Sequence, residues 1–148
     1  GDRLRPLEAA AEAAESELEQ DILALAKDLA ASCIESKAVD VTILDLRGLV
    51  DFADFFVLAT ARNPRQVRAV AEAVRQCAKH DHDTQAVGVE GMTSGKWVLA
   101  DFGDVVVHVF DRDMRTFYDL DGLWRDAPHI DPPDVEVDEL PEPFFTLT

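Results

Sequence analysis

The chain has 148 residues, of which 47% are hydrophobic, and its formal net charge is −16. This length suits one ordinary globular domain. The sequence holds no apolar run near the roughly 20 residues that a membrane helix needs, and it begins with no charged-then-apolar signal segment. We therefore expect one soluble cytoplasmic domain that makes no membrane contact.

The acidic excess is concentrated toward the two ends of the chain. Residues 1–20 carry a net charge of −4 and residues 126–148 carry −7, which leaves −5 for the residues between them. Such a chain repels phosphate backbones, so nucleic acid is a poor candidate for its principal direct ligand. A basic protein surface is a better electrostatic partner, although solubility alone explains the acidic ends equally well.

The first predicted helix covers residues 17–35, with Ser16 and Glu19 as a capping box. The Ala- and Glu-rich residues 6–15 before it suit either a helix or a frayed segment. One apolar stripe recurs every three or four residues and predicts the buried side of the helix. It consists of Leu18, Ile22, Leu25, Leu29 and Cys33.

Two strands and a second helix are predicted next. β-branched and apolar residues indicate strands over 41–46 and 54–60. Asn63 then caps a helix that has Pro64 at its first position, where a missing N–H costs nothing. The only basic region of the chain lies in or near this helix and comprises Arg62, Arg65, Arg68 and Arg75.

Residues 79–83 are predicted to form a polar turn, and a short strand is predicted over 87–90. A hairpin then covers 97–110, with Gly103 at the first position of a type II′ turn. Residues 105–107 are all valine, which is typical of a central strand buried on both faces.

The last predicted elements are a short helix over 112–118 and a second short turn that carries Leu120, Leu123 and Trp124. From Pro128 onward the chain is rich in proline and acidic residues, which indicates an extended tail. Phe144 and Phe145 suggest that this tail docks on a surface.

The predicted fold class is α/β, a single domain with a mixed β-sheet covered by helices. We divide the chain into an acidic N-terminal extension (1–16), the domain itself (17–127) and an acidic proline-rich tail (128–148). The two cysteines, Cys33 and Cys77, both fall in predicted helices without ligand-like spacing. This argues against a disulfide framework or a zinc site and fits reduced thiols.

A set of segments carries a more specific pattern: 45–49 (DLRGL), 53–59 (ADFFVLA), 65–71 (RQVRAVA), 88–91 (GVEG), 97–109 (WVLADFGDVVVHV), and 117–120 (FYDL) with 123–124 (LW). In order and spacing over roughly residues 20–130, they resemble the ribosomal silencing factor family, also called the Iojap family. One such motif is weak evidence, whereas the ordered set is specific.

The resemblance implies a nucleotidyltransferase-like fold without a working active site, and a protein that is not an enzyme. It implies binding to large-subunit ribosomal protein number fourteen at the subunit-joining face. Steric blocking of the small subunit then represses translation during nutrient limitation or in stationary phase. Some family members form homodimers, and organellar relatives act in ribosome assembly. The sequence departs from the family at 61–64 (ARNP), where small Gly, Thr and Ser residues are usual.

The candidate partner-binding residues are Glu90, Gly91, Trp97, Leu99, Asp101, Tyr118 and Trp124. Alternation along the predicted strand puts Trp97, Leu99 and Asp101 on one face and Val98 and Ala100 on the other. If Trp97 faces outward, it is an aromatic anchor of the kind enriched in interfaces. A strand tryptophan is more often part of the core, and only the resemblance favours the interface.

No catalytic, cofactor-binding or metal-binding residue is predicted. Asp101 and Asp104 could hold Mg²⁺ beside a nucleotide, but Asp104 occupies a turn and no Gly-rich phosphate loop accompanies the pair. His108 is a lone histidine among valines, without a positioned nucleophile. The alternatives are therefore a large-subunit assembly factor and, in another class, a divergent nucleotide-binding enzyme or nucleotidyltransferase.

Overall fold

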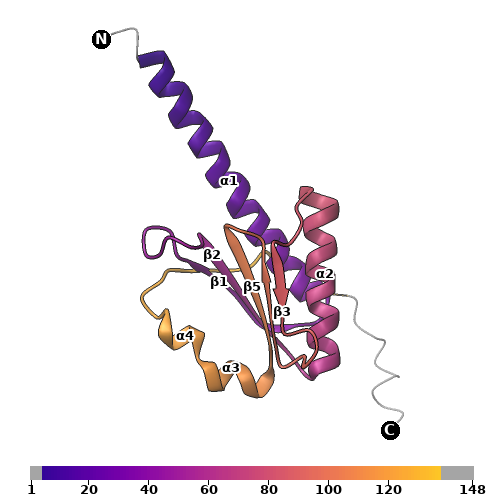
Figure 1. The fold of residues 1–148 in the computed structure, drawn as a ribbon. Coiled ribbons are helices and arrows are strands. Elements are labelled where there is room, and N and C mark those ends of the chain that lie inside the picture. The colour runs from indigo at the N-terminus through magenta and orange to yellow at the C-terminus, as the bar shows by residue number, and fades with distance from the viewer. Residues whose placement is uncertain (1–4, 138–148) are drawn as a thin grey trace.

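The computed structural model describes residues 5–137, which form one mixed six-stranded sheet in the order β3-β4-β5-β2-β1-β6 (Figure 1). The strands are β1 (Val39–Asp45), β2 (Phe55–Ala61), β3 (Gly88–Glu90), β4 (Trp97–Asp101), β5 (Val105–Asp111) and β6 (His129–Ile130). The helices are α1 (Arg5–Glu35), α2 (Pro64–His82), α3 (Arg112–Tyr118) and α4 (Leu120–Leu123). The predicted single α/β domain with a mixed sheet is confirmed.

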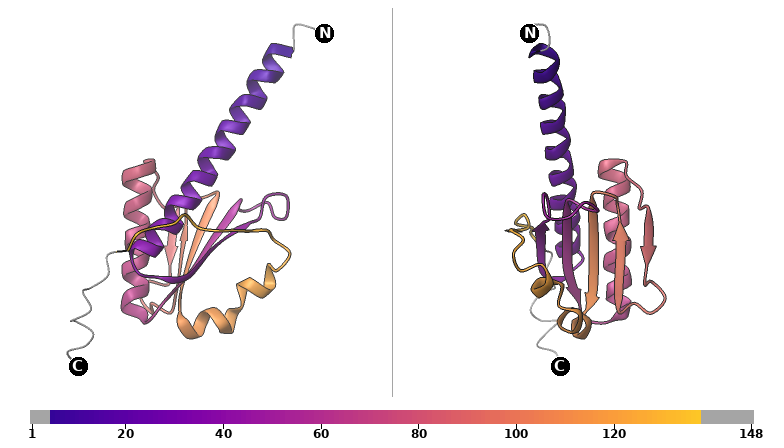
Figure 2. Two further views of the ribbon diagram at one scale, coloured as in Figure 1. Left: turned by 180° about the vertical axis from the view of Figure 1, so that it is seen from behind. Right: turned by 60° about the vertical axis from the view of Figure 1, so that its left-hand side comes forward.

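The helices are divided unequally between the two faces of the sheet (Figure 2). One face is covered by α1 and α2, whereas the opposite face is covered only in part, by α3, α4 and the segment after them. The prediction of a sheet covered by helices therefore holds for one face. Among the described residues, no helix is both long and apolar enough to cross a bilayer.

The centre of the sheet is the parallel pair β2 and β5, in which Phe55 is opposite Val105. All other neighbouring strands are antiparallel. β2 is buried along its whole length, and β5 is buried except at Asp111. This confirms the prediction of a central strand through the valines 105–107.

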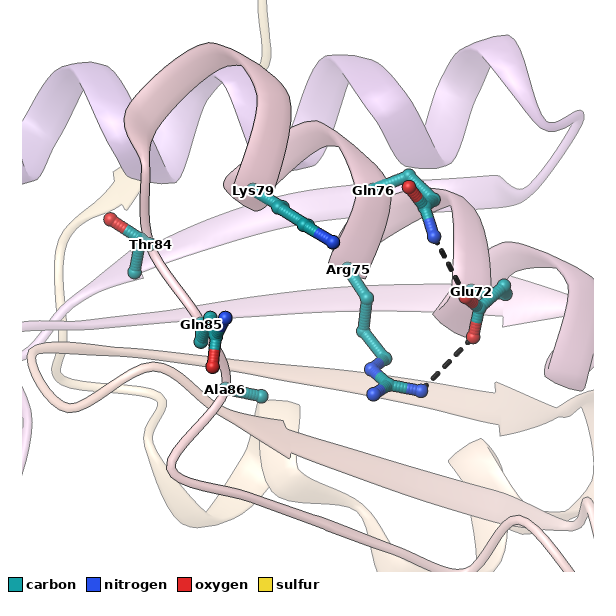
Figure 3. A pocket seen from close by; sticks show the side chains of 7 residues that line it. All are labelled: Glu72, Arg75, Gln76, Lys79, Thr84, Gln85 and Ala86. Atoms are coloured by element: carbon teal, nitrogen blue, oxygen red, sulfur yellow. Dashed lines mark hydrogen bonds and ion pairs between the residues drawn. The ribbon is translucent and has the colours of Figure 1, made fainter.

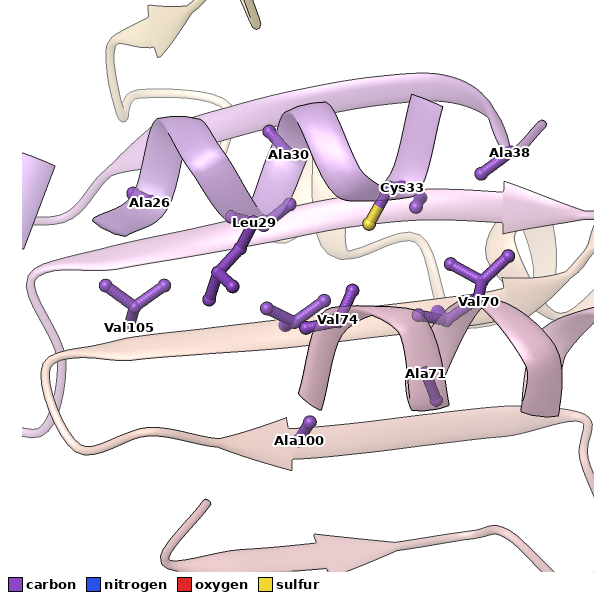
Figure 4. Packing of buried hydrophobic residues seen from close by; sticks show 14 of the residues in the cluster. Ala26, Leu29, Ala30, Cys33, Ala38, Val70, Ala71, Val74, Ala100 and Val105 are labelled. Carbon is purple, nitrogen blue, oxygen red and sulfur yellow. The ribbon is translucent and has the colours of Figure 1, made fainter. Parts of the chain in front are cut away.

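The larger core lies between the sheet and the helices α1 and α2 (Figure 4). Leu29 of α1 points toward Val74 of α2 and Val105 of β5, and all three side chains are fully buried. Small residues such as Ala30 and Ala71 let the two helices lie close to the sheet and to each other. Cys33 is also buried here, and burial raises the pKa of its thiol to about 12, which makes it unreactive at neutral pH.

The N-terminal helix is longer than the capping-box pattern predicts. α1 runs without a break from Arg5, so Ser16 lies inside the helix and the predicted cap at Ser16 and Glu19 is wrong. The alanine-rich residues 9–14 have high helix propensity and continue the helix through the expected start. Residues 5–20 are all exposed, and Figure 1 shows this half of α1 projecting from the domain.

The second helix starts as predicted but ends later. The Asn63 side chain accepts a hydrogen bond from the Gln66 backbone N–H at 2.9 Å, which confirms the cap. α2 continues to His82, so the predicted polar turn over 79–83 is wrong. The basic residues of the last turn favour the helix C-terminus electrostatically, and His82 Nε2 bonds Asp28 of α1 at 2.7 Å.

The hairpin and the end of the domain complete the sheet. Gly103 has φ +89°, whereas Asp104 is not among the residues with positive φ, and both signs agree with the predicted type II′ turn. The predicted tail differs at its start, because His129 and Ile130 form β6 and pair with the otherwise open edge of β1. Phe144 and Phe145 lie outside the described residues, so their docking stays a prediction.

The contrast between the two halves of α1 gives a stability test. Leu29→Ala removes a fully buried side chain and is expected to lower the free energy of unfolding by about 2–5 kcal/mol. Leu18→Ala, the same change at a 59% exposed position of the same helix, should stay within about 0.5 kcal/mol of the original. Urea unfolding measures both, and equal losses would contradict this account of the core.

Candidate functional site

The face of the sheet opposite α1 and α2 carries a continuous group of rings. Alternation along β4 turns Trp97, Leu99 and Asp101 toward this side, while Val98 and Ala100 point into the helix-covered core. Trp97 therefore faces away from α1 and α2. We call the group the aromatic face; its members are Phe56, Trp97, His108, Phe110, Tyr118 and Trp124.

Strand register explains which candidates lie together. Glu90 of β3 is opposite Leu99 of β4, and Leu99 is in turn opposite His108 of β5. Directly opposed residues point to the same side of a sheet, so the exposed Glu90 side chain borders the aromatic face. Glu90, Leu99 and Trp97 are thus brought onto one side, as the sequence pattern predicted for Trp97 and Leu99.

Trp97 is held firmly even though it faces away from the main core. Its ring stacks on Phe110 at a centroid distance of 5.1 Å and lies 4.6 Å from the ring of Tyr118. Its indole Nε1 donates a hydrogen bond to Nδ1 of His108 at 3.1 Å. Trp97 is therefore half-buried, and its packing fixes the position of the exposed Tyr118.

Trp124 lies elsewhere on the same face and contacts different residues. Its ring meets Phe56 edge-on at 6.1 Å and the exposed Phe52 at 6.4 Å. The contact between Phe56 and His108, at 4.5 Å, joins this group to Trp97. The two predicted tryptophans thus belong to one network, although they do not contact each other within it.

Gly91 contributes through its backbone. It has φ +93°, and a Cβ added there would lie 2.0 Å from the carbonyl oxygen of Trp97. Any side chain at this position would therefore strain the loop and displace the start of β4. Gly91 positions Trp97 and offers no side chain for contact.

The aspartates of the hairpin serve its geometry. Asp101 Oδ1 accepts a hydrogen bond from the Gly103 N–H at 2.8 Å. The carbonyl oxygen of Asp104 accepts one from the Asp54 N–H, also at 2.8 Å. Within residues 5–137, no group of three or more His, Cys, Asp or Glu side chains is arranged to hold a metal ion.

Arg115 fixes α3 and α4 at one end of the aromatic face. Its guanidinium bonds the carboxylate of Asp121 at 2.9 Å and the hydroxyl of Thr60 at 3.1 Å, and it also donates to the Asp40 carbonyl. The hydrogen bond from Arg115 lowers the pKa of Asp121 below its usual value. This network ties the short helices to β1 and β2, and so holds Tyr118 beside Trp97.

His108 is the least solvated polar group of the site, with 3% of its surface exposed. Burial lowers its pKa from 6.5 to about 4, so the imidazole is neutral at physiological pH. The bond from Trp97 to Nδ1 requires the proton on Nε2. Nε2 has no hydrogen-bond partner among the described residues, so only one of the two ring nitrogens is hydrogen-bonded there.

Several ring residues were not among the predicted candidates. Phe56 and Phe110 line the face from β2 and β5, while Phe52 and Phe117 are exposed beside Trp124 and Tyr118. Alternation within β5 could have placed Phe110 on one side with His108. Exposed rings next to a partly covered sheet face make this side the candidate interaction surface of the domain.

Comparison with known proteins gives one consistent match. The family described as "RsfS: Ribosomal silencing factor during starvation" matches residues 16–144. The Bacillus subtilis protein named "Ribosomal silencing factor RsfS" is 40% identical over 105 residues, which is 71% of this chain and 88% of that protein. The Arabidopsis thaliana "Protein Iojap, chloroplastic" is 35% identical over 120 residues, 81% of this chain and 50% of that protein.

A solved structure agrees with these matches. The crystal structure of a Chromobacterium violaceum protein is similar with a TM-score of 0.68 at 34% identity, covering 79% of this chain and 93% of that one. Residues 5–15, the outer part of α1, lie before the family match begins.

The buried histidine predicts a specific pH dependence. The folded-state pKa of about 4 lies below the unfolded value of 6.5, so the unfolded chain takes up the proton first as pH falls. The contribution of His108 is thus fully present above pH 6.5 and is lost toward pH 4, by about 3 kcal/mol at most.

His108→Asn keeps an acceptor for Trp97 Nε1 but does not titrate. Its free energy of unfolding should therefore fall less between pH 6.5 and 4 than that of the original chain, as measured by urea unfolding. His80→Asn, at an exposed position, is the matched control, and the change in the pH curve should be larger for His108→Asn than for His80→Asn. Parallel pH curves for the original chain and His108→Asn would contradict the assigned burial.

Proposed function

Because the chain belongs to the ribosomal silencing factor family, whose members are ribosome-binding regulators and not enzymes, we propose that its aromatic face docks on the large ribosomal subunit. The proposed contact is large-subunit ribosomal protein number fourteen, at the surface where the subunits join. A bound domain there occupies space that the small subunit needs. Translation is then repressed under nutrient limitation or in stationary phase, in keeping with the family's description.

The observation that carries this proposal is the aromatic face itself. Rings of Trp97, Tyr118 and Trp124 lie on a sheet side that α1 and α2 leave uncovered, and Tyr118 remains 47% exposed. Large, rigid aromatic side chains supply most of the binding energy in many interfaces. The carboxylate of Glu90 at the border adds the charge that a basic ribosomal protein favours.

The proposed fold relationship is to nucleotidyltransferases, with the catalytic features missing. Where that fold uses a Gly-Ser turn, this chain has residues 61–64, which end β2 and cap α2. The paired carboxylates expected after such a turn are absent from the sequence, and Asp101 caps the hairpin. These features support a binding domain over the rival nucleotide-binding enzyme.

The homodimer and the cytoplasmic location stay predictions. A dimer follows only from the resemblance. The matched relatives differ in location, because the plant proteins are named as chloroplastic and mitochondrial. We propose the cytoplasm on the basis of the bacterial relatives.

Docking through the aromatic face is tested by co-sedimentation with separated ribosomal subunits. Trp97→Glu is expected to weaken binding to large subunits at least about 30-fold, the effect of losing an interface anchor. Leu18→Glu puts the same charge on an exposed apolar position of α1, away from this face, and should bind normally. Unchanged binding of Trp97→Glu would contradict the assignment of the aromatic face as the docking site.

Because Trp97 is half-buried, Trp97→Glu can lose binding through misfolding alone. A second variant at an exposed position therefore tests the aromatic face independently. Glu90→Lys changes an exposed side chain at the border and should slow association with large subunits while leaving the urea midpoint unchanged. Normal association of Glu90→Lys together with normal binding of a folded Trp97→Glu would reject the face.

A subunit-joining assay distinguishes a translation repressor from a large-subunit assembly factor. Purified chain added to mature small and large subunits is expected to shift them away from the joined state, because the docked domain occupies the joining surface. Sedimentation profiles measure the shift, and Trp97→Glu is the matched control. Normal joining in the presence of bound chain would favour the assembly factor.

A further inference from the structure

The second helix carries a row of cations that the docking proposal does not use. Arg65, Arg68, Arg75 and Lys79 follow one another at separations of three, seven and four residues, which puts them on one side of α2. We call this row the basic stripe. From Arg65 to Lys79 it extends about 21 Å along the helix, at about 1.5 Å per residue.

Most of these charges are available for a ligand. Within residues 5–137, the only ion pair of the stripe joins Arg75 to Glu72 at 3.1 Å. Arg65 and Lys79 are exposed and make no ion pair there. A concentrated positive row on a chain of net charge −16 is a local feature that the overall charge does not predict.

A pocket of about 230 Å³ lies at the C-terminal end of the stripe. Glu72, Arg75, Gln76 and Lys79 line it from α2, and Thr84, Gln85 and Ala86 line it from the connection to β3. Figure 3 shows Lys79 extending toward Arg75, whose guanidinium turns to Glu72, while Gln85 lies across from them on the connection. The pocket therefore combines the Arg75–Glu72 ion pair with the ammonium group of Lys79 and the side-chain amides of Gln76 and Gln85. Ammonium, guanidinium and amide groups all donate hydrogen bonds to phosphate oxygens.

We propose that the basic stripe and its pocket bind the phosphodiester backbone of ribosomal RNA next to the docking site. This proposal rests on the proposed function, since that function brings the chain against a surface rich in RNA. Guanidinium groups match phosphate geometry with paired donors, and a row about 21 Å long can follow successive phosphates. None of the basic-stripe residues is aromatic, so the contact is to backbone and not to stacked bases.

The position of α2 allows both contacts at once. α2 packs on the helix-covered face against β4 and β5, and its pocket opens beside the connection to β3 at the sheet edge. The aromatic face lies on the other side of that edge. Ribosomal RNA that lies beside the docked domain can therefore contact the basic stripe. The contact supplements the protein contact, which agrees with RNA being unsuited as the principal ligand.

The test measures how binding to large subunits depends on salt. In the full chain, the double variant Arg65→Gln with Lys79→Gln removes two exposed cations and keeps good helix formers. The slope of log affinity against log salt should become shallower by about 1.4, which is about 0.7 for each lost phosphate contact on single strands. If the two proteins bind equally at 1 M salt, this slope change lowers the affinity at 0.1 M salt by about 25-fold.

The matched control is Lys27→Gln with Lys37→Gln, which removes the same charge from α1 and the turn after it. It should change the salt slope little. An equal effect of both double variants would mean that only net charge matters and would overturn the proposal. An unchanged slope in the stripe variant would also overturn it, while binding lost through Trp97→Glu alone would still support docking.

A photocrosslinking residue in place of the exposed Gln76, which lines the pocket, identifies what lies there. Crosslinks to ribosomal RNA are expected. Crosslinks only to an acidic ribosomal protein, or none on large subunits that bind normally, would reject RNA as the ligand. If the original chain fails to bind large subunits at all, the proposed function fails first, and this inference fails with it.

Discussion

The parallel pairing of β2 with β5 is the constraint on which the rest of the structure depends. Parallel neighbours cannot be joined by a tight turn, so the chain must leave the sheet and return between Ala61 and Val105. It does so through α2, which packs beside α1 on one face. The other face keeps only the short helices α3 and α4, and the rings gathered there stay accessible in part. The connection through α2 therefore places the larger core on one face of the sheet and leaves the proposed docking surface on the other.

Local patterns predicted much of this fold because they reflect local physics. The Asn63 cap, the type II′ turn at Gly103 and the alternation along β4 all depend on a few neighbouring residues. The predictions fail where a stronger term, local or long-range, overrides the pattern. Ser16 lies within a long alanine-rich helix, and the last turn of α2 is held by the bond between His82 and Asp28 of another helix. β6 forms because β1 offers an open edge.

The candidate site is likewise predictable from the sequence only in part. Alternation put Trp97, Leu99 and Asp101 on one side of a strand, and only the assembled sheet shows that this side faces away from α1 and α2. The partners that hold Trp97 come from β5 and α3, so no motif around Trp97 itself predicts them. The sequence marks Gly91 as a contact candidate, and the assembled structure adds a steric requirement, since the backbone of Trp97 occupies the space of a side chain there. His108 is a structural member of the face and owes its neutrality to burial.

The placement of the two tryptophans has a spectroscopic consequence. The chain contains two tryptophans, Trp97 and Trp124, and both belong to the aromatic face. Light absorbed by indole is therefore emitted from this one surface. Emission wavelength and quenching by added iodide report the solvation of that surface directly, without an attached dye. The protein carries a built-in optical probe at the place where a partner would displace water.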